Sequence, residues 1–186
     1  MEYKSFYDSP VGRIVMVSDG NALSYLGFDE QRFENPVLPS LIEKEDLSAV
    51  SLAKKWLDIY FSGKDPGFCV PLSLKGTTFQ KTVWEILLTI PFGTTVSYSY
   101  VASHAAERLS KDRMSCRAAG SAVGHNPVSI IVPCHRVVGK NGSLTGYGGG
   151  LARKMMLLET EGIDTSVFSM PRHFRAFNHI ADDLMH

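Results

Sequence analysis

Cysteine is scarce in this chain, and the few cysteines follow no framework. Three occur among 186 residues, at positions 69, 116 and 134. An odd number without framework spacing excludes a small secreted domain held together by disulfides, and it favours free thiols in a reducing compartment. A zinc site is an open alternative, although the spacing matches no usual zinc pattern; its candidate ligands are Cys116, His125, Cys134 and His135.

Long apolar runs are also lacking. No run approaches the ~18 residues of a membrane-spanning helix, and the opening MEYKSFYDSP contains no apolar segment typical of signal peptides. We find no internal repeat and no low-complexity tract. With an apolar share of 44%, the composition is that of a soluble globular protein, and no membrane partner is expected.

Net charge is absent, but the charged residues are unevenly placed. Residues 1–75 carry 8 basic and 11 acidic side chains, whereas residues 107–154 carry 8 basic and 2 acidic ones. This asymmetry indicates a polyanionic partner for the second half of the chain. On charge alone, chance clustering on a solvated surface explains it equally well.

The first 75 residues are predicted to form a small α/β domain. Three short runs have strand character, YKSFY, RIVMVS and ALSYLGF, and SDGN forms a turn between the last two. Residues 29–46 are polar and contain two prolines, so we expect a loop. Apolar residues from Leu47 to Phe61 then recur at helical spacing, with Asp46 as the candidate N-cap and Gly63 after the last turn. The run FCVPL is a candidate for one more strand.

Residues 76–165 are predicted to form a mainly helical domain, followed by a tail over residues 166–186. Thr77 and Gln80 have capping-box spacing for a first helix that stops before Pro91. A second helix begins near Ser97 and Tyr98, and a third covers about 114–124. The strand VSIIV, a glycine-rich loop and a last helix over residues 151–161 follow. In the tail, weak apolar spacing surrounds Phe174, Phe177 and Ile180.

The overall fold class is therefore mixed α/β or α+β, with the second and third helices in the order of a winged-helix-like helix-turn-helix. The third of these helices, MSCRAAGSAVG, is mostly Ala, Gly and Ser, so few of its side chains could read base edges. Small residues allow a helix backbone to approach the minor groove of DNA closely. Tight helix packing inside the core explains the same composition.

A thiol and an imidazole stand side by side at the end of the predicted strand VSIIV, in PCHRVVG. Adjacent side chains of a regular strand point to opposite faces, so Cys134 and His135 should not touch directly unless the chain bends or a water bridges them. Cys134 is either a buried structural thiol or a nucleophile with His135 as its base. Glu159 and Glu161 at the end of the last helix are candidates to orient the imidazole. The glycines at 146 and 148–150 permit backbone close to a flat ligand.

These motifs occur together in one known family. PCHRVVG, preceded by GHNP and followed by GYGGGLARKMMLLETEG, resembles the methylated-DNA–protein-cysteine methyltransferases, also called O6-alkylguanine-DNA alkyltransferases. The resemblance covers residues 79–162 closely, and the segment before them in layout only. It implies repair by direct transfer of an alkyl group from O6-alkylguanine in double-stranded DNA to the protein, with O4-alkylthymine as a further substrate and one turnover per molecule.

The resemblance also implies a role for each residue that matches the family's pattern. Cys134 is the alkyl acceptor, His135 the base that acts through a bound water, and Glu161 the carboxylate that orients it. Asn126 shapes the cysteine loop, and Tyr98 helps to rotate a phosphate and touches the flipped base. The remaining residues fall into a DNA-contacting set, Arg117, Ala118, Ala119, Gly120 and Arg136, and a pocket set, Val137, Tyr147, Gly148 and Gly149.

Within these sets, Arg117 fills the gap left by the extruded guanine. The backbone carbonyls of Cys134 and Val137 accept hydrogen bonds from the amino group of that guanine. A serine often found in the family is Gly148 here, so a hydrogen bond to the base oxygen must come from backbone. The segment from Tyr98 to Arg117 is longer than in short members. The family implies no cofactor, and the zinc ligands of some relatives are absent from the first domain, so we predict no metal. It further implies a monomer, cytoplasmic and nucleoid-associated in a prokaryote and nuclear in a eukaryote.

Two other functions are compatible with these motifs. A cysteine hydrolase using Cys134, His135 and a glutamate would turn over and would need an oxyanion hole near the thiol. A non-enzymatic helix-turn-helix sensor or regulator of DNA lesions would leave Cys134 incidental. Relatives that only bind lesions replace this cysteine, and here it is intact.

Overall fold

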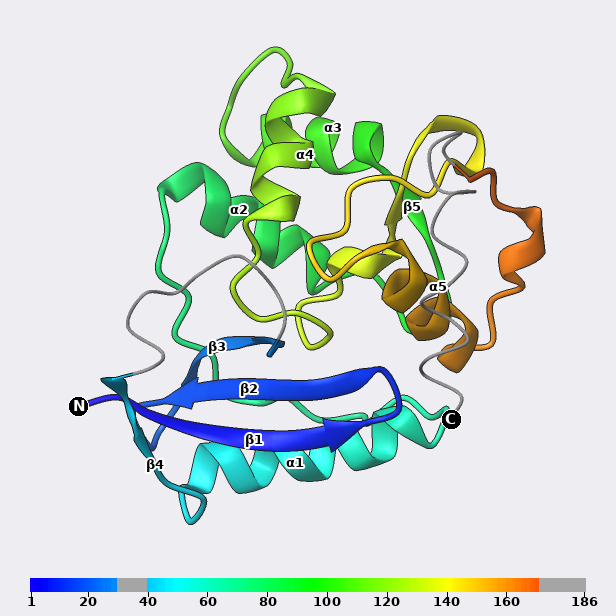
Figure 1. Ribbon diagram of the computed structural model, residues 1–186. Helices are drawn as coiled ribbons and strands as arrows, with labels where there is room; N and C mark the ends of the chain where they lie inside the picture. The colour runs from blue at the N-terminus through cyan, green and yellow to red at the C-terminus, as the bar shows by residue number, and fades with distance from the viewer. Residues whose placement is uncertain (30–39, 171–186) are drawn as a thin grey trace.

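The first part of the chain forms a four-stranded sheet with one long helix packed against it (Figure 1). The computed structural model describes residues 1–29 and 40–170. The sheet has the strand order β3-β2-β1-β4, antiparallel except for the parallel pair β1–β4. Its strands are β1 (Tyr3–Ser9), β2 (Gly12–Ser18), β3 (Leu23–Phe28) and β4 (Ile42–Glu43), and its helix is α1 (Ser48–Phe61).

The three predicted strands at the start of the chain are confirmed, but three neighbouring details are wrong. Strand β4 falls within the segment predicted as a loop, part of which lies outside the described residues. FCVPL forms no strand; it contributes only an isolated bridge between Leu72 and Leu23. Asp46 is not the N-cap of α1, because Leu47 occupies that position without a side-chain cap. The start of α1 is tied instead to the β2–β3 turn, where Ser48 Oγ donates to the carbonyl of Gly20 at 2.8 Å.

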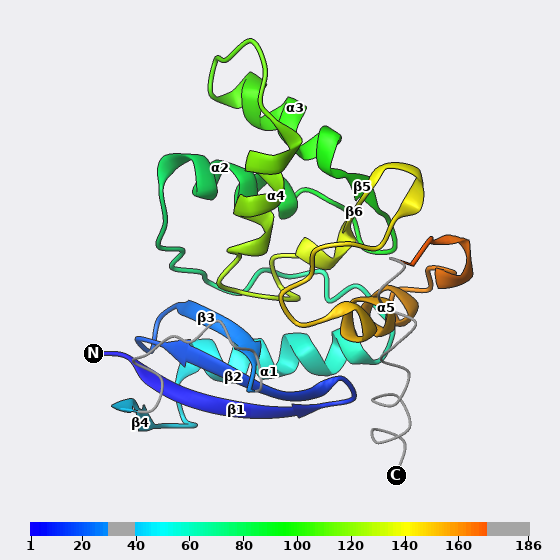
Figure 2. The same cartoon turned by 45° about the horizontal axis from the view of Figure 1, so that its top comes forward.

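The second part is mainly helical, and its helix starts follow local capping chemistry. Thr77 and Gln80 form the predicted capping box of α2 (Thr78–Leu87). Ser97 caps α3 (Tyr98–Arg108), and Ser115 caps α4 (Cys116–Gly124), which therefore begins two residues later than predicted. These three helices pack against one another, with α3 and α4 in helix-turn-helix order (Figure 2).

The run VSIIV is not a strand, which corrects the prediction. Only Val128 pairs, in a bridge to Leu26 at the edge of the sheet, and a turn follows it. Two backbone bonds hold this bridge: Leu26 N donates to Pro127 O at 2.9 Å, and Ser129 N donates to Leu26 O at 2.8 Å. Ile130 then adopts a φ of 70°, a left-handed conformation that is rare for a β-branched residue. The apolar residues of the run are buried because the turn lies inside the protein rather than because they form a strand.

This buried turn leads directly into the segment that carries the thiol. Residues Cys134–Arg136 form a short 3-10 helix, η2, and β6 (Val137–Val138) follows it. Strand β6 pairs in parallel with β5 (Val96–Ser97), which immediately precedes α3. The two-residue pairing therefore brings the first residue of α3 beside the cysteine segment. The chain continues through η3 (Lys140–Gly142), α5 (Leu151–Thr160) and η4 (Thr165–Val167).

A single buried cluster connects the sheet part with the helical part. It contains Leu26 and Tyr60 from the first part and Val128, Cys134 and Leu157 from the second. A domain boundary near residue 75 stays a prediction. The predicted apolar spacing in the tail lies outside the described residues. Among the helices that the structure describes, none has the length and apolarity to cross a membrane.

Candidate active site

Cys134 is buried, and one asparagine fixes its surroundings. Its exposed fraction is 6%. The Nδ2 atom of Asn126 lies 3.1 Å from Sγ of Cys134 and donates to the carbonyl of Val132 at 2.7 Å. On its other side Oδ1 of Asn126 accepts from the backbone N of Val128 at 3.0 Å. The asparagine therefore clamps both sides of the buried turn and presents a hydrogen-bond donor to the sulfur.

Burial raises the pKa of the Cys134 thiol, while the hydrogen bond from Asn126 and the charge of Lys154 oppose that rise. The resting sulfur is therefore a protonated thiol that needs a base before it can act as a nucleophile. The side-chain amide of Asn126 and the ammonium group of Lys154 would stabilise the thiolate once the proton has left.

His135 is fully buried and bonded to Glu161. Its Nε2 atom lies 2.6 Å from Oε1 of Glu161. An ionised carboxylate only accepts hydrogen bonds, so Nε2 must carry the ring proton. The Nδ1 atom then has a free lone pair, and it has no hydrogen-bond partner within residues 1–29 and 40–170. Burial lowers the pKa of His135, although Glu161 opposes this, so the imidazole stays neutral and able to accept a proton.

Glu161 is the centre of a buried hydrogen-bonded cluster. Arg136 donates through Nε to Oε2 at 2.9 Å and through Nη2 to Oε1 at 3.1 Å, and the backbone N of Gly93 donates to Oε2 at 2.9 Å. Burial acts against ionisation, but the hydrogen bond from His135 and the bonds and charge of Arg136 outweigh it and lower the pKa of Glu161 to about 2. The carboxylate is therefore ionised throughout the physiological range.

Arg136 is not a DNA contact, which corrects the expectation from the resemblance. It is 7% exposed, its guanidinium is committed to Glu161, and Nη1 donates to the carbonyl of Ile90 at 2.6 Å. A guanidinium inside the protein needs a paired carboxylate, and Glu161 supplies it. Of the two glutamates that could orient the imidazole, Glu159 is exposed and bonds to Thr165 instead.

The adjacency of Cys134 and His135 is explained by the 3-10 turn η2. In a regular strand the two side chains would lie on opposite faces, but here the backbone bends and both side chains are buried in the same interior. The thiol faces Asn126, and the imidazole faces Glu161 with its unprotonated nitrogen unpaired. The unpaired Nδ1 atom of His135 is therefore available to accept a proton.

Tyr98, the first residue of α3, lies at the same site. Its hydroxyl donates to the carbonyl of Thr145 at 3.0 Å and lies 3.3 Å from that of Gly146. Burial raises the pKa of Tyr98 to about 12, so the hydroxyl remains a donor. Gly146 has a φ of 64°, and an added Cβ would come within 3.0 Å of the tyrosine oxygen. The predicted backbone freedom of the glycine-rich loop is therefore used to seat this tyrosine.

Sequence reasoning missed Lys154, which is fully buried beneath the site. Its Nζ atom donates to the carbonyl of Val137 at 2.6 Å and to that of Thr145 at 3.1 Å. Burial lowers the pKa of Lys154 to about 8, and Cys134 partly counteracts this. The sequence did contain a signal for this burial. Lys154 precedes Leu157 by three residues, so both side chains lie on the same face of the helix, and Leu157 is apolar.

The predicted pocket residues divide into different roles. Val137 is buried and its carbonyl already accepts from Lys154. Gly148 is exposed, whereas Gly149 is buried, and an added Cβ there would lie 2.7 Å from Tyr147 and 2.8 Å from Phe28. Gly149 therefore keeps the loop in contact with strand β3 of the sheet. Phe28 had no signal in the sequence, because only the fold brings β3 to this loop.

On α4, the predicted DNA-contacting residues do not all face outward. Arg117 is exposed, and Ala118 and Gly120 are half-buried, but Ala119 is completely buried against the core. Ala119 is therefore not available to a groove, because the 3.6-residue period turns one in every three or four positions inward.

For the zinc alternative, no group of three His, Cys, Asp or Glu able to hold a metal ion exists in the described part of the chain.

A buried thiol served by an imidazole and a carboxylate, beside a helix-turn-helix, defines a DNA-binding protein with a nucleophilic cysteine. Residues 78–163 match the family described as 6-O-methylguanine DNA methyltransferase, DNA binding domain, and residues 2–74 match its ribonuclease-like domain. Together these matches span most of the chain. The protein belongs to the 6-O-methylguanine DNA methyltransferase family.

Individual relatives agree with this assignment. A methylated-DNA–protein-cysteine methyltransferase of Mycobacterium tuberculosis is 46% identical over 155 residues, which cover 83% of this chain and 88% of the relative. That of Haemophilus influenzae is 36% identical and covers 87% of each. Among solved structures, the O6-methylguanine methyltransferase of M. tuberculosis has a TM-score of 0.75 at 42% identity, covering 96% of this chain and 100% of that one. The M. tuberculosis OGT in complex with DNA has a TM-score of 0.73 at 40% identity, covering 95% and 99%.

Proposed function

We propose that this protein repairs DNA by transferring the alkyl group of O6-alkylguanine to Sγ of Cys134. The observation that carries the proposal is the buried pair of Cys134 and His135, with Nε2 of the histidine held at 2.6 Å by Glu161 and Nδ1 left as an acceptor. Membership of the family supports the substrate, because the relatives are named for methylated DNA and for a cysteine acceptor. O4-alkylthymine is a second candidate substrate.

The transfer balances without a cofactor. The thiol proton passes to Nδ1 of His135 through a bridging water, and Lys154 and Asn126 stabilise the thiolate that remains. The sulfur attacks the alkyl carbon in line, and the C–S bond forms as the C–O bond breaks. The guanine anion that leaves is then protonated at N1, and the proton that His135 took from the thiol balances this step. Tyr98 assists departure by donating a hydrogen bond from its hydroxyl to the purine, for which it must release the carbonyl of Thr145.

The target base must leave the duplex to reach the sulfur of Cys134, a residue that is 6% exposed. We expect Arg117, which is exposed on α4, to enter the base stack in place of the extruded base. The small residues on the exposed side of α4 suit the minor groove. The guanine amino group needs backbone acceptors, and the carbonyls of Cys134 and Val137 each already accept one hydrogen bond and retain a second lone pair.

The test is a titration of a duplex oligonucleotide carrying O6-methylguanine against a fixed amount of protein, followed by intact-protein mass measurement. The expected result is a plateau at one equivalent and the added mass of one methyl group. The product is a thioether, whose saturated carbon has no adequate leaving group, so water cannot regenerate the thiol. Continued repair to many equivalents would indicate a hydrolytic enzyme, and DNA binding without a mass change would indicate a sensor.

A Cys134→Ser variant locates the acceptor. Serine is nearly isosteric but a poor nucleophile without strong activation, so we expect no alkyl uptake and nearly unchanged affinity for DNA. Cys69→Ser and Cys116→Ser are matched controls, because both cysteines are exposed. Alkyl uptake by the Cys134→Ser variant would assign the acceptor to another residue.

A further inference from the structure

The sheet part of the molecule contributes one side chain to the buried acid–base cluster. Tyr60 belongs to the last turn of α1, and its exposed fraction is 0%. Its hydroxyl donates to Oε1 of Glu161 at 2.9 Å, across a sequence separation of 101 residues. The two ribbon views agree in placing the end of α1 close to α5, which leads to Glu161 (Figure 1 and Figure 2).

Tyr60 also lies 3.3 Å from Nε2 of His135. Since Nε2 already donates its proton to the carboxylate, it has no lone pair for the tyrosine. The hydroxyl hydrogen is therefore directed to Oε1 of Glu161 at 2.9 Å, in preference to the carbonyl of Leu157, which lies farther away at 3.4 Å. Tyr60 and His135 consequently share one carboxylate oxygen.

The tyrosine ring is held firmly in this position. It stacks on Trp56 with ring centroids 5.3 Å apart, and it contacts Phe92 and His135 edge to face at 6.0 and 6.3 Å. This packing and the exposed fraction of 0% keep the hydroxyl away from water. The hydrogen bond to Glu161 is therefore part of the buried cluster.

We propose that Tyr60 is a positioning residue through which the N-terminal part sets the basicity of His135 and hence the reactivity of Cys134. This inference rests on the proposed function. By donating to Oε1, the hydroxyl withdraws negative charge from Glu161, which then holds the proton of Nε2 less strongly. The imidazolium form of His135 is correspondingly less favoured, and the ring stays neutral near pH 7 with Nδ1 ready to take the thiol proton.

Other charged and titratable groups surround the same cluster and must be held constant in any test. They come from η2, the glycine-rich loop and α5, and they are Cys134, Arg136, Tyr147 and Lys154. None of them is altered by removing the tyrosine hydroxyl alone, because a phenylalanine ring keeps the packing against Trp56 and Phe92.

The test compares Tyr60→Phe with Tyr7→Phe. Tyr7 is a matched control because it is in the same sheet part and its hydroxyl also donates to a carboxylate, Oδ1 of Asp58 at 2.8 Å, but on the exposed surface. For each variant the rate of methyl transfer from a duplex is measured across pH 5–9, together with the melting temperature and the tautomer and protonation state of His135 by nitrogen-15 NMR.

Loss of the hydroxyl makes Glu161 more basic and favours the imidazolium, so the acidic limb of the pH–rate profile should move to higher pH. For Tyr60→Phe we expect the limb to shift by about one pH unit, so that the rate on the acid side falls about ten-fold. This size is typical for the loss of one hydrogen bond to a charged group. Tyr7→Phe should leave the limb in place. His135 of the Tyr60→Phe variant should protonate at higher pH in the NMR titration.

An unchanged limb and an unchanged NMR titration in Tyr60→Phe, whatever its melting temperature, would overturn the inference and leave only a packing role. Failure of the proposed function would be recognised by a different result, namely that the wild-type protein takes up no methyl group. The NMR titration reports on Tyr60 even then.

Discussion

The ammonium group of Lys154 lies 2.6 Å from the carbonyl oxygen of Val137, in the interior of the protein and without a carboxylate partner among the described residues. A buried ammonium without an anion is costly, and the low pKa of about 8 reflects that cost. The anion that forms at this site during the reaction is the thiolate of Cys134. The lysine is therefore arranged for the reacting state rather than for the resting one.

The first prediction concerns this lysine. Lys154→Met keeps the length of the side chain and removes its charge, so the thiol pKa of Cys134 should rise. We expect methyl transfer at pH 7 to slow on the order of ten-fold, equivalent to about one pKa unit, and the loss to shrink at higher pH. Lys55→Met, on the exposed face of α1, is the control. A uniform loss at every pH would point to packing rather than charge.

The second prediction concerns base extrusion. Arg117→Ala should slow repair of duplex DNA by about ten- to a hundred-fold, the range expected when help with flipping worth a few kcal/mol is lost. Reaction with the free base O6-methylguanine should be almost unaffected, since no flipping is needed. Equal losses on duplex and free base would show that the arginine shapes the pocket.

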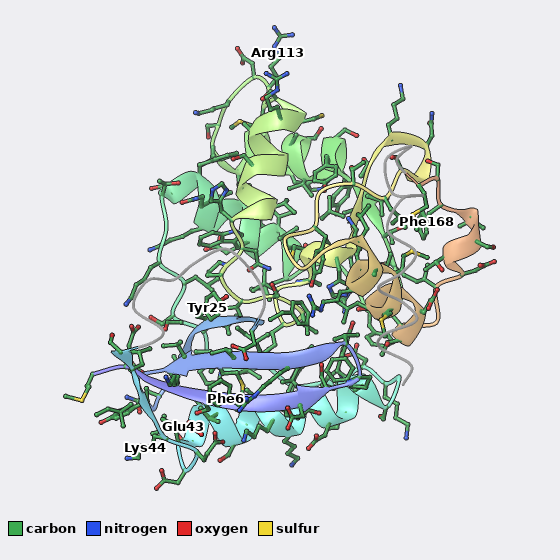
Figure 3. The ribbon with its side chains drawn as sticks, viewed as in Figure 1. Phe6, Tyr25, Glu43, Lys44, Arg113 and Phe168 are labelled. Atoms are coloured by element: carbon green, nitrogen blue, oxygen red, sulfur yellow. The ribbon has the colours of Figure 1, made fainter. Side chains whose placement is uncertain are left out.

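Arg113→Ala is the matched control for Arg117. Arg113 lies at the tip of the turn between α3 and α4 and points away from the body of the protein (Figure 3). Its loss should weaken DNA binding and reduce the salt dependence, as expected for a phosphate contact, without changing the ratio of duplex to free-base rates.

The third prediction concerns acid stability. The pKa of Glu161 is about 2 in the folded protein, against a usual 4.5. Because the folded value is depressed, the stabilisation is complete above about pH 4.5 and is lost as the pH falls toward 2. Its size is on the order of 3 kcal/mol. Urea unfolding at pH 7 and pH 3 should therefore show a smaller pH dependence in Glu161→Gln than in the wild-type protein.

Glu159→Gln is the control for this substitution, because it is on the same helix but exposed. It should retain the wild-type slope of stability against pH. Glu161→Gln should also be less stable at pH 7, since Arg136 then becomes an unpaired buried charge. If both variants follow the wild-type slope, acid unfolding is governed by other carboxylates.

The fourth prediction is that the methylated protein melts at a lower temperature. The added group occupies a packed site, where overpacking typically costs about 1–3 kcal/mol. For a chain of this size about 2–4 °C is lost per kcal/mol. Calorimetry before and after one equivalent of substrate measures the difference, and an equal or higher melting temperature would count against a packed acceptor site.

The sequence by itself determined the chemistry and the local elements. PCHRV, the upstream Asn126 and the downstream Glu161 identified the reacting group, and Ser, Thr and Gln at defined positions set the helix starts. These features are local because hydrogen bonds within a few residues produce them. The family resemblance rests on the same short motifs.

Only the tertiary structure decided which side chains surround that chemistry. VSIIV has the composition of a strand, but β3 pairs with just one of its residues and the rest turn inward. Arg136 looks like a DNA contact until its buried partner is seen, and the sequence gives no sign that Tyr60 and Phe28, from distant segments, reach the site. Such contacts join residues far apart in the chain, and they depend on how the sheet and the helices pack rather than on any local preference.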